Sequence, residues 1–370
     1  MIQKNIFPKL EELGFDTFLK DAYSSLGTSG TLPARIIGQE RNRYIVLHQY
    51  GESFATISGH ALYHEMPDDI RPTVGDWVVI REINDGEAIL EMILPRRSKL
   101  SRQVAGGRDR FVGGNTAEQV VAANVDTVFI VCSLDSERNM RLRRIERYLA
   151  LVWSAGASPV IVLNKVDLCP DVPAHVHEVE QIALGVPIVT LSAITKVGIE
   201  SLNVYLTKGK TAVFLGLSGV GKSSIINASL GEERLKTGEV RQSDFRGRHT
   251  TTRRELLMLP QGGMVIDTPG MREIQLWGND DILETFGDIE QLAVNCRFRD
   301  CKHISEPGCV VNKAITEGTL DRHRLHNYRK MQKEVRYLTV RQNGKARLEE
   351  KLKWKKISQL QKQIQKNQEE

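Results

Sequence analysis

The stretch Gly216-Leu-Ser-Gly-Val-Gly-Lys-Ser-Ser224 decides the fold, because it matches the phosphate-binding pattern G-x-x-x-x-G-K-S. The apolar run Thr211–Leu215 before it is typical of a buried strand, and Ser223–Leu230 after it is typical of a helix that ends at Gly231. In that order, glycines let backbone N–H groups turn inward around a phosphate, and the helix N-terminus adds partial positive charge. The sequence therefore predicts a nucleoside triphosphate site rather than a chance glycine-rich turn.

The residue types in this loop have distinct predicted tasks. The Lys222 ammonium would reach the β- and γ-phosphates, and the Ser223 hydroxyl would ligate the Mg²⁺ that accompanies the nucleotide. The remaining positions would present their backbone to the phosphates. The predicted loop comprises Gly216, Leu217, Ser218, Gly219, Val220, Gly221, Lys222, Ser223 and Ser224.

A second motif, N-K-x-D, follows another apolar run and predicts recognition of guanine. The Asp167 carboxylate can accept hydrogen bonds from both the N1–H and the 2-amino group of guanine, whereas adenine offers neither, so we expect GTP and GDP as ligands. Lys165 would lie across the base plane, and Asn164 would brace the phosphate loop. Four such letters alone usually mark a surface loop, but the preceding strand and the P-loop favour the base-reading interpretation. The predicted base-binding residues are Asn164, Lys165, Val166 and Asp167, together with Ser192 and Ala193, whose backbone would meet the guanine O6.

Two further segments downstream of the P-loop predict the switches of a GTPase. The stretch Asp267-Thr-Pro-Gly270 matches D-x-x-G, which would put Asp267 near Mg²⁺ and the Gly270 N–H near the γ-phosphate. A hairpin is expected before it, with strands at 255–259 and 264–266. One threonine of the run Thr250–Thr252 would be a second Mg²⁺ ligand. The sequence leaves the choice open, and we take Thr251 and Thr252 as the candidates.

The order of these motifs is unusual, because N-K-x-D and S-A precede the P-loop instead of following it. Ligand sites in open α/β sheets lie at the carboxyl ends of strands whatever the chain order, so the rearrangement is compatible with an intact site. The short segment Thr207–Lys210 would be the link that joins the original ends. We therefore predict an α/β P-loop GTPase domain with circularly permuted motif order over residues 113–282.

The region before this domain has a different pattern. Residues 32–112 hold about five short apolar or alternating runs separated by turn signals, which predicts a small antiparallel barrel of the oligonucleotide-binding (OB) type. Such a barrel can bind RNA through a basic, aromatic face, or it can serve only as a spacer. Residues 1–31 are expected to form a helical lead, at about 10–23, and a linker, to which the sequence assigns no function.

Three cysteines and a histidine crowd together after the α/β domain. The spacing Cys296-x₄-Cys301-x-His303-x₅-Cys309 offers three thiolates and one imidazole, the usual set for one tetrahedral structural zinc. Four protein ligands leave no open position, so catalysis at the metal is not expected. The alternative is a loop of unligated residues. We predict a small, mostly helical zinc-binding module over residues 283–336, in which the metal replaces a core.

Positive charge is concentrated at the C-terminal end of the chain. Residues 321–370 hold fifteen Lys and Arg against six Asp and Glu, so this part carries +9 of formal charge while the whole chain carries +5. A basic helical tail at 337–370 favours a polyanionic partner, although a solvated helix without a partner is the alternative. Neither a long apolar run nor a signal sequence is present, so no membrane partner and a cytoplasmic location are expected.

Together these motifs resemble the ribosome small subunit-dependent GTPase A family, a bacterial family of circularly permuted GTPases. The resemblance covers about residues 32–335. It implies hydrolysis of GTP to GDP and phosphate, stimulated by the small ribosomal subunit, whose late maturation the protein would assist through binding of rRNA. It also strengthens the zinc prediction, because the family's zinc module has the same spacing. We expect a monomer.

These motifs do not by themselves supply the residue that would orient the attacking water. Met271 follows D-x-x-G and cannot orient a water molecule. His249 is the nearest candidate for a catalytic residue, and the resemblance points to it, although a surface-loop histidine is the alternative. Two other classes of function stay open: an RNA-binding module that senses GTP with negligible turnover, and a P-loop kinase for a small molecule.

Overall fold

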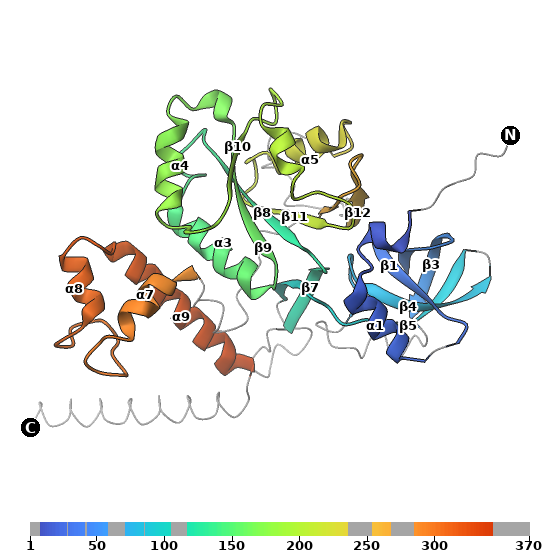
Figure 1. Cartoon of the computed structure of the whole chain (residues 1–370), viewed down its shortest axis with the longest axis horizontal. Coiled ribbons are helices and arrows are strands. Elements are labelled where there is room, and N and C mark those ends of the chain that lie inside the picture. The colour runs from blue at the N-terminus through green and yellow to red at the C-terminus, as the bar shows by residue number, and fades with distance from the viewer. Residues whose placement is uncertain are drawn as a thin grey trace, which may run out of the picture. The chain divides into compact units, whose positions relative to one another are not determined.

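The computed structural model describes residues 8–27, 29–40, 43–57, 71–84, 86–104, 117–235, 254–267 and 285–342. The chain divides into two compact units, Met1–Gln103 with Glu118–Gln275, and Val104–Ala117 with Leu276–Glu370. The first unit holds an N-terminal segment, a barrel and an α/β sheet, and the second holds a small helical module (Figure 1).

The α/β sheet is built as the motif order predicts. Among the described residues, its strands follow the order β10-β9-β8-β11-β13-β12, and each neighbouring pair is parallel except β12 with β13, which form the expected hairpin. Strand β8 is buried along its whole length, including Cys132, because the sheet is covered on both faces. The bounds are β8 Thr127–Ser133, β9 Ser158–Asn164, β10 Ile188–Leu191, β11 Thr211–Leu215, β12 Glu255–Met258 and β13 Met264–Asp267.

Helices connect these strands and complete the core. Helix α3 packs against β8 and β9 (Figure 1). The segment 199–206 is not α-helical: one 3-10 turn, η3, is followed by further turns that bury Leu202 and Leu206. Runs of 3-10 geometry rarely exceed three or four residues, which limits this element. The bounds are α3 Leu142–Ser154, η2 Val166–Leu168, α4 Val172–Glu180, η3 Ile199–Leu202 and α5 Lys222–Leu230.

Five of the described strands form the predicted barrel. Their order is β1-β2-β3-β5-β4, and an additional pairing of β1 with β4 closes it. The expectation of a purely antiparallel barrel is wrong for one pair, because β3 and β5 are parallel. The chain after β3 carries β4 to the other side of β1, so β5 returns beside β3 in the same direction. The bounds are β1 Leu32–Gln39, β2 Tyr44–His48, β3 Gly51–Ile57, β4 Trp77–Asn84 and β5 Glu87–Ile93.

The barrel and the α/β sheet are hydrogen-bonded to each other. Strand β1 pairs with β12, where Gly38 lies opposite Glu255, so both belong to one eleven-stranded sheet in the described part of the chain. A separate two-stranded sheet of β6, Lys99–Val104, and β7, Ala117–Ala123, lies between them in sequence. Backbone pairing of β1 with β12 thus joins the barrel to the α/β sheet.

The N-terminal segment is packed rather than extended from the barrel. The expected helix at 10–23 is broken into a 3-10 turn η1, Leu10–Leu13, and a helix α1, Thr17–Ser25. The break lies at Gly14, whose φ is 90° and where a Cβ would lie 2.7 Å from the carbonyl oxygen of Gly209. Only glycine fits this approach to the link between η3 and β11.

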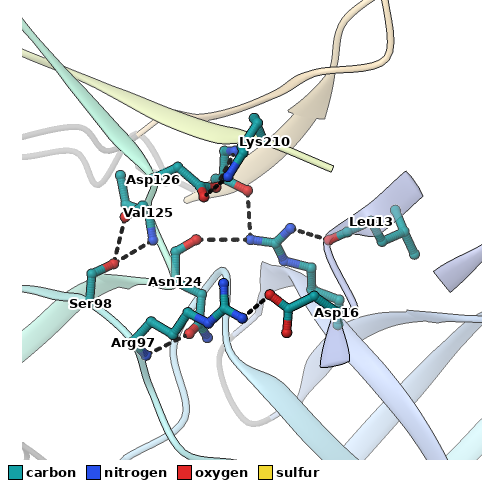
Figure 2. A network of polar contacts seen from close by, with 10 residues as sticks. Leu13, Asp16, Arg97, Ser98, Asn124, Val125, Asp126 and Lys210 are labelled. Atoms are coloured by element: carbon teal, nitrogen blue, oxygen red, sulfur yellow. Dashed lines mark hydrogen bonds and ion pairs between the residues drawn. The ribbon is translucent and has the colours of Figure 1, made fainter. Parts of the chain in front are cut away.

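A buried arginine, Arg35, ties these parts together, and its partners Leu13 and Asn124 are labelled in Figure 2. Arg35, on β1, is 1% exposed, and its guanidinium donates to the Leu13 carbonyl, to the Asn124 carbonyl at 3.3 Å and to the Thr211 hydroxyl at 2.7 Å. Burial lowers its pKa to about 10, so it remains charged at neutral pH. Around it, Arg97 pairs with Asp16 in the same network. The contacts join the N-terminal segment, the barrel and the first residue of β11.

The second unit is held by its own polar contacts. It contains α7, Gly287–Ala293, α8, Val310–Thr316, and α9, Arg322–Gln342. Arg324 of α9 is bound twice to Asp288 of α7, at 2.8 and 2.9 Å, and also donates to the Thr285 carbonyl. In the described ranges, no helix has both the length and the apolar composition needed to cross a membrane.

Candidate functional site

The predicted nucleotide-binding residues converge at the carboxyl ends of neighbouring strands. The P-loop follows β11, the N-K-x-D segment follows β9 and the S-A pair follows β10. Because β8, β9, β10 and β11 are consecutive and parallel, these loops leave the same edge of the sheet. The circular permutation therefore changes the chain order but not the spatial grouping of the motifs.

Close packing explains two glycines of the P-loop. A Cβ at Gly216 would lie 2.4 Å from the Val131 carbonyl oxygen of β8, and a Cβ at Gly221 would lie 2.2 Å from Nδ2 of Asn164. Both residues also have positive φ, 158° and 97°. Gly221 is the N-cap of α5, so the helix N-terminus opens onto the loop as the phosphate-binding pattern requires.

The P-loop lysine lies against its own loop. The Lys222 ammonium donates to the carbonyl oxygens of Gly216 at 2.9 Å and Leu217 at 2.6 Å. The positive charge is therefore already held at the loop where a phosphate would bind. Burial, with a contribution from the Glu255 carboxylate, raises the pKa of Asp267 at the end of β13, and the nearby Lys222 charge opposes this shift.

Asn164 is the junction of three segments. Its Nδ2 donates to the Val220 carbonyl of the P-loop at 2.8 Å, and its Oδ1 accepts from the Ala193 N–H at 3.1 Å. The side chain is 1% exposed, so these bonds are protected from water. The Ala193 N–H thus has an acceptor in this structure, and its contact with guanine O6 stays a prediction.

Lys165 and Asp167 lie beside this junction and face solvent to different degrees. Asp167 is exposed within η2, where a base could reach its carboxylate. Lys165 has a left-handed backbone, with φ 65°, and its ammonium lies 2.6 Å from Oδ2 of Asp135. Sequence reasoning missed Asp135. The available signal was a carboxylate just beyond β8, the strand next to the one that carries N-K-x-D.

Several predicted residues lie outside the described ranges. They are His249, Thr250, Thr251, Thr252, Gly270 and Met271. Asp267 is described and lies at the carboxyl end of β13, which pairs with the P-loop strand β11. Its position fits a role beside the phosphate loop, and its function as a Mg²⁺ neighbour stays a prediction.

The cysteine–histidine cluster brings four potential metal ligands together. The ligand atoms of Cys296, Cys301, His303 and Cys309 all lie within 4.8 Å of one another. The Sγ atoms of Cys296 and Cys309 are 4.0 Å apart, and the His303 Nδ1 lies 3.7 and 3.5 Å from them. Tetrahedral zinc, with bonds of about 2.3 Å to sulfur and 2.0–2.1 Å to nitrogen, requires about 3.8 Å between sulfurs and 3.5 Å between sulfur and nitrogen. The residues therefore fit a metal ion.

The loop that carries the ligands is fixed by its neighbours. Burial, with a contribution from Arg329, lowers the pKa of His303 and favours the neutral imidazole that binds metals. The Glu306 carboxylate accepts from the backbone N–H groups of Lys302 at 3.0 Å, Ile304 at 2.8 Å and Ser305 at 3.0 Å. Cys309 is the N-cap of α8. The sequence predicted the four residues of the cluster but not Glu306, whose hydrogen-bond partners here are backbone N–H groups.

This combination of a closed five-stranded barrel, a permuted P-loop sheet and a helical module with a metal-binding cluster defines a circularly permuted GTPase. Solved structures share the fold. The crystal structure of YjeQ from Thermotoga maritima matches with a TM-score of 0.59 and 30% identity, over 82% of this chain and 98% of that one. The structure of YloQ, described as a circularly permuted GTPase, matches with a TM-score of 0.58 and 24% identity, over 83% of this chain and 96% of that one.

Sequence relatives extend the match over most of the chain. The Opitutus terrae protein named small ribosomal subunit biogenesis GTPase RsgA is 43% identical, over 95% of this chain and 96% of its own length. The protein of the same name from Xylella fastidiosa is 47% identical, over 82% of this chain and 85% of its own. The chain belongs to the RsgA GTPase family, whose model matches residues 93–277.

A second family model also matches part of the chain. The ABC transporter model covers residues 199–369, which include the P-loop that many nucleotide-binding proteins share. It leaves out β8, β9 and β10, which carry the N-K-x-D and S-A segments. The strand arrangement and the relatives therefore support the GTPase assignment, and the kinase alternative is set aside.

Proposed function

We propose that this chain hydrolyses GTP to GDP and phosphate in the late maturation of the small ribosomal subunit, with turnover stimulated by that subunit. The observation that carries the proposal is the Asn164 junction, which joins the P-loop to both base-reading segments in one site. The relatives match most of this chain and are named small ribosomal subunit biogenesis GTPases, which supports the ribosomal role.

The site residues are assigned roles on this basis. The P-loop backbone would hold the phosphates, with Lys222 as their cation and Ser223 as a Mg²⁺ ligand. Asp167 would read the guanine edge, and Lys165 would cover the base. Thr251 or Thr252, with Asp267 and Gly270, would respond to the γ-phosphate and its Mg²⁺. When bound, Mg²⁺ supplies charge for the phosphate oxygens, while this chain's own residues select and orient the nucleotide.

The partners follow from two parts of the chain outside the nucleotide site. The barrel and the basic tail would bind rRNA of the small subunit, through aromatic and basic side chains and through phosphate contacts. On the barrel, the Arg43 guanidinium lies 4.0 Å from the centre of the Phe54 ring, a pair suited to stacking with a base. We further propose a monomeric, cytoplasmic protein with one structural zinc in the cysteine–histidine cluster.

Single-turnover hydrolysis tests the proposal. GTP hydrolysis by the purified protein is measured alone, with small ribosomal subunits and with large subunits as the control. We expect acceleration only by small subunits, because the proposed RNA contacts lie on that particle. His249→Ala should keep GTP affinity and reduce the stimulated rate. No acceleration by small subunits would reject the ribosomal role, and an unchanged stimulated rate would remove His249 from hydrolysis.

A further inference from the structure

Asp135 and Lys165 come from neighbouring parallel strands and meet beside the predicted base site. Ser133, the last residue of β8, lies opposite Asn164, the last residue of β9. The Leu134 N–H donates to the Asn164 carbonyl at 2.9 Å, which extends the strand pairing by one residue. The next side chains along the two segments therefore leave the sheet close together, and Oδ2 of Asp135 lies 2.6 Å from the Lys165 ammonium.

The Asp135 carboxylate is held in place by two side chains other than Lys165. Its Oδ1 accepts from the Ser133 hydroxyl at 2.7 Å and from Nδ2 of Asn139 at 3.0 Å. Asn139 also donates to the Ser133 hydroxyl oxygen at 3.0 Å, so the three side chains form a closed set of hydrogen bonds. Partial burial acts to raise the pKa of Asp135, but the hydrogen bonds from its donors outweigh it and lower the pKa to about 2. The carboxylate is thus oriented and charged at any working pH.

Lys165 differs from an ordinary surface lysine in its backbone conformation and in its limited exposure. Its backbone is in the left-handed region, with φ 65° and ψ 40°, which few non-glycine residues adopt. The side chains of Lys165 and Asp135 are only 24% and 27% exposed, so solvent and salt screen their attraction less than at an open surface. Without a partner, rotation about the four side-chain bonds of Lys165 would let its ammonium occupy many positions.

We propose that Asp135 is a positioning residue for guanine nucleotide binding, which holds the Lys165 side chain in place so that its stem can cover the base plane. The inference rests on the proposed function, because it assumes that the base binds beside Lys165. Lys165 contacts the face of the base, whereas Asp167 reads its edge. Asp135 should therefore affect affinity without changing the preference between guanine and hypoxanthine nucleotides.

The test compares nucleotide affinities of the full-length protein by displacement of a fluorescent GDP analogue. Asp135→Asn should weaken GTP, GDP and ITP alike, by about fivefold to tenfold, as expected for loss of a partly shielded ion pair. Asn139→Ala, which keeps the carboxylate but removes one donor, should give a smaller loss. Glu11→Gln removes the partner of Lys20 in an exposed ion pair and should change nothing.

A double-mutant cycle separates positioning from a general structural effect. In the Lys165→Met background, Asp135→Asn should cause no further loss, because the partner is already gone. An equal loss in both backgrounds, tighter binding by Asp135→Asn, or a changed ratio of GTP to ITP affinity would overturn the inference. Failure of the unmodified protein to bind guanine nucleotides would instead overturn the proposed function, and this inference with it.

Discussion

Arg35 donates a hydrogen bond to the hydroxyl of Thr211 over 2.7 Å, across 176 positions of sequence. Arg35 belongs to the barrel and Thr211 is the first residue of β11, the strand that ends at the P-loop. The bond is buried and is one of several from the same guanidinium. A single side chain therefore fixes the barrel to the base of the strand that delivers the phosphate loop.

Removal of this guanidinium should destabilise the first unit. Arg35→Met keeps the stem but leaves the Leu13 and Asn124 carbonyls without this donor, so the free energy of unfolding should fall by about 2–4 kcal/mol. Urea unfolding followed by circular dichroism measures it. The control is Arg81→Met, which breaks an exposed pair with Glu91 and should cost less than about 1 kcal/mol. Equal effects of the two variants would contradict the role given to Arg35.

Loss of the Asn164 side chain should weaken nucleotide binding more than folding. Asn164→Ala removes the bonds to the Val220 carbonyl and the Ala193 N–H, so the P-loop and the S-A segment lose their common support. Affinity for GTP and GDP should fall by about 10- to 100-fold. Calorimetric titration measures it, with Asn203→Ala, an exposed amide, as the control. Unchanged affinity would show that the loops hold their positions without this bridge.

Base preference should follow the side chain at position 167. Asp167→Asn places an amide donor opposite the 2-position of the base, so the variant should lose affinity for GTP and gain affinity for XTP. Competition of both nucleotides against a fluorescent GDP analogue gives the preference. A variant that still selects GTP would mean that another segment reads the base.

The metal cluster should be separable from the nucleotide site. Cys301→Ser should lose the bound metal, measured by elemental analysis, because a hydroxyl is a poor replacement for a thiolate on zinc. GTP affinity should be unchanged, since the cluster lies in the other compact unit. Cys169→Ser, outside the cluster, should keep its metal. Loss of GTP binding together with the metal would contradict this separation.

The basic tail should control the salt dependence of binding to the small subunit. Each released counterion steepens the fall of affinity with salt, so deletion of residues 337–370 should flatten the slope of log affinity against log salt concentration. Intrinsic GTP affinity should not change. Sedimentation with small subunits at several salt concentrations measures the slope. The same slope with and without the tail would leave it as solvated charge.

Much of the α/β domain could be predicted because its signals are local. Each motif stands next to an apolar run, and a parallel sheet brings the ends of such runs to one edge, so Asn164 could be placed beside the P-loop from sequence. The cysteine–histidine cluster could be predicted in the same way, because its residues, from Cys296 to Cys309, lie close together in sequence. In both cases residue type and spacing carry the information.

The rest depends on contacts between distant segments. The break at Gly14 is imposed by the approach of Gly209, and the parallel pairing of β3 with β5 is decided by the path of the chain between them. Nothing local separates Arg35, which is buried, from the many exposed arginines of this chain. Asp135 meets Lys165 only because β8 and β9 are neighbouring strands in the sheet. Such tertiary choices leave no periodic pattern in the sequence.

The pairing of Gly38 with Glu255 has a consequence for the solubility of the isolated domain. Without the barrel, β12 would be an outermost strand with unpaired N–H and C=O groups on one side. Such strands recruit strands from other molecules and initiate aggregation. In the intact chain, β1 pairs with β12 at Gly38 and Glu255, the first residue of β12, and so covers the start of that side. The barrel should therefore also reduce self-association of the GTPase domain through this edge.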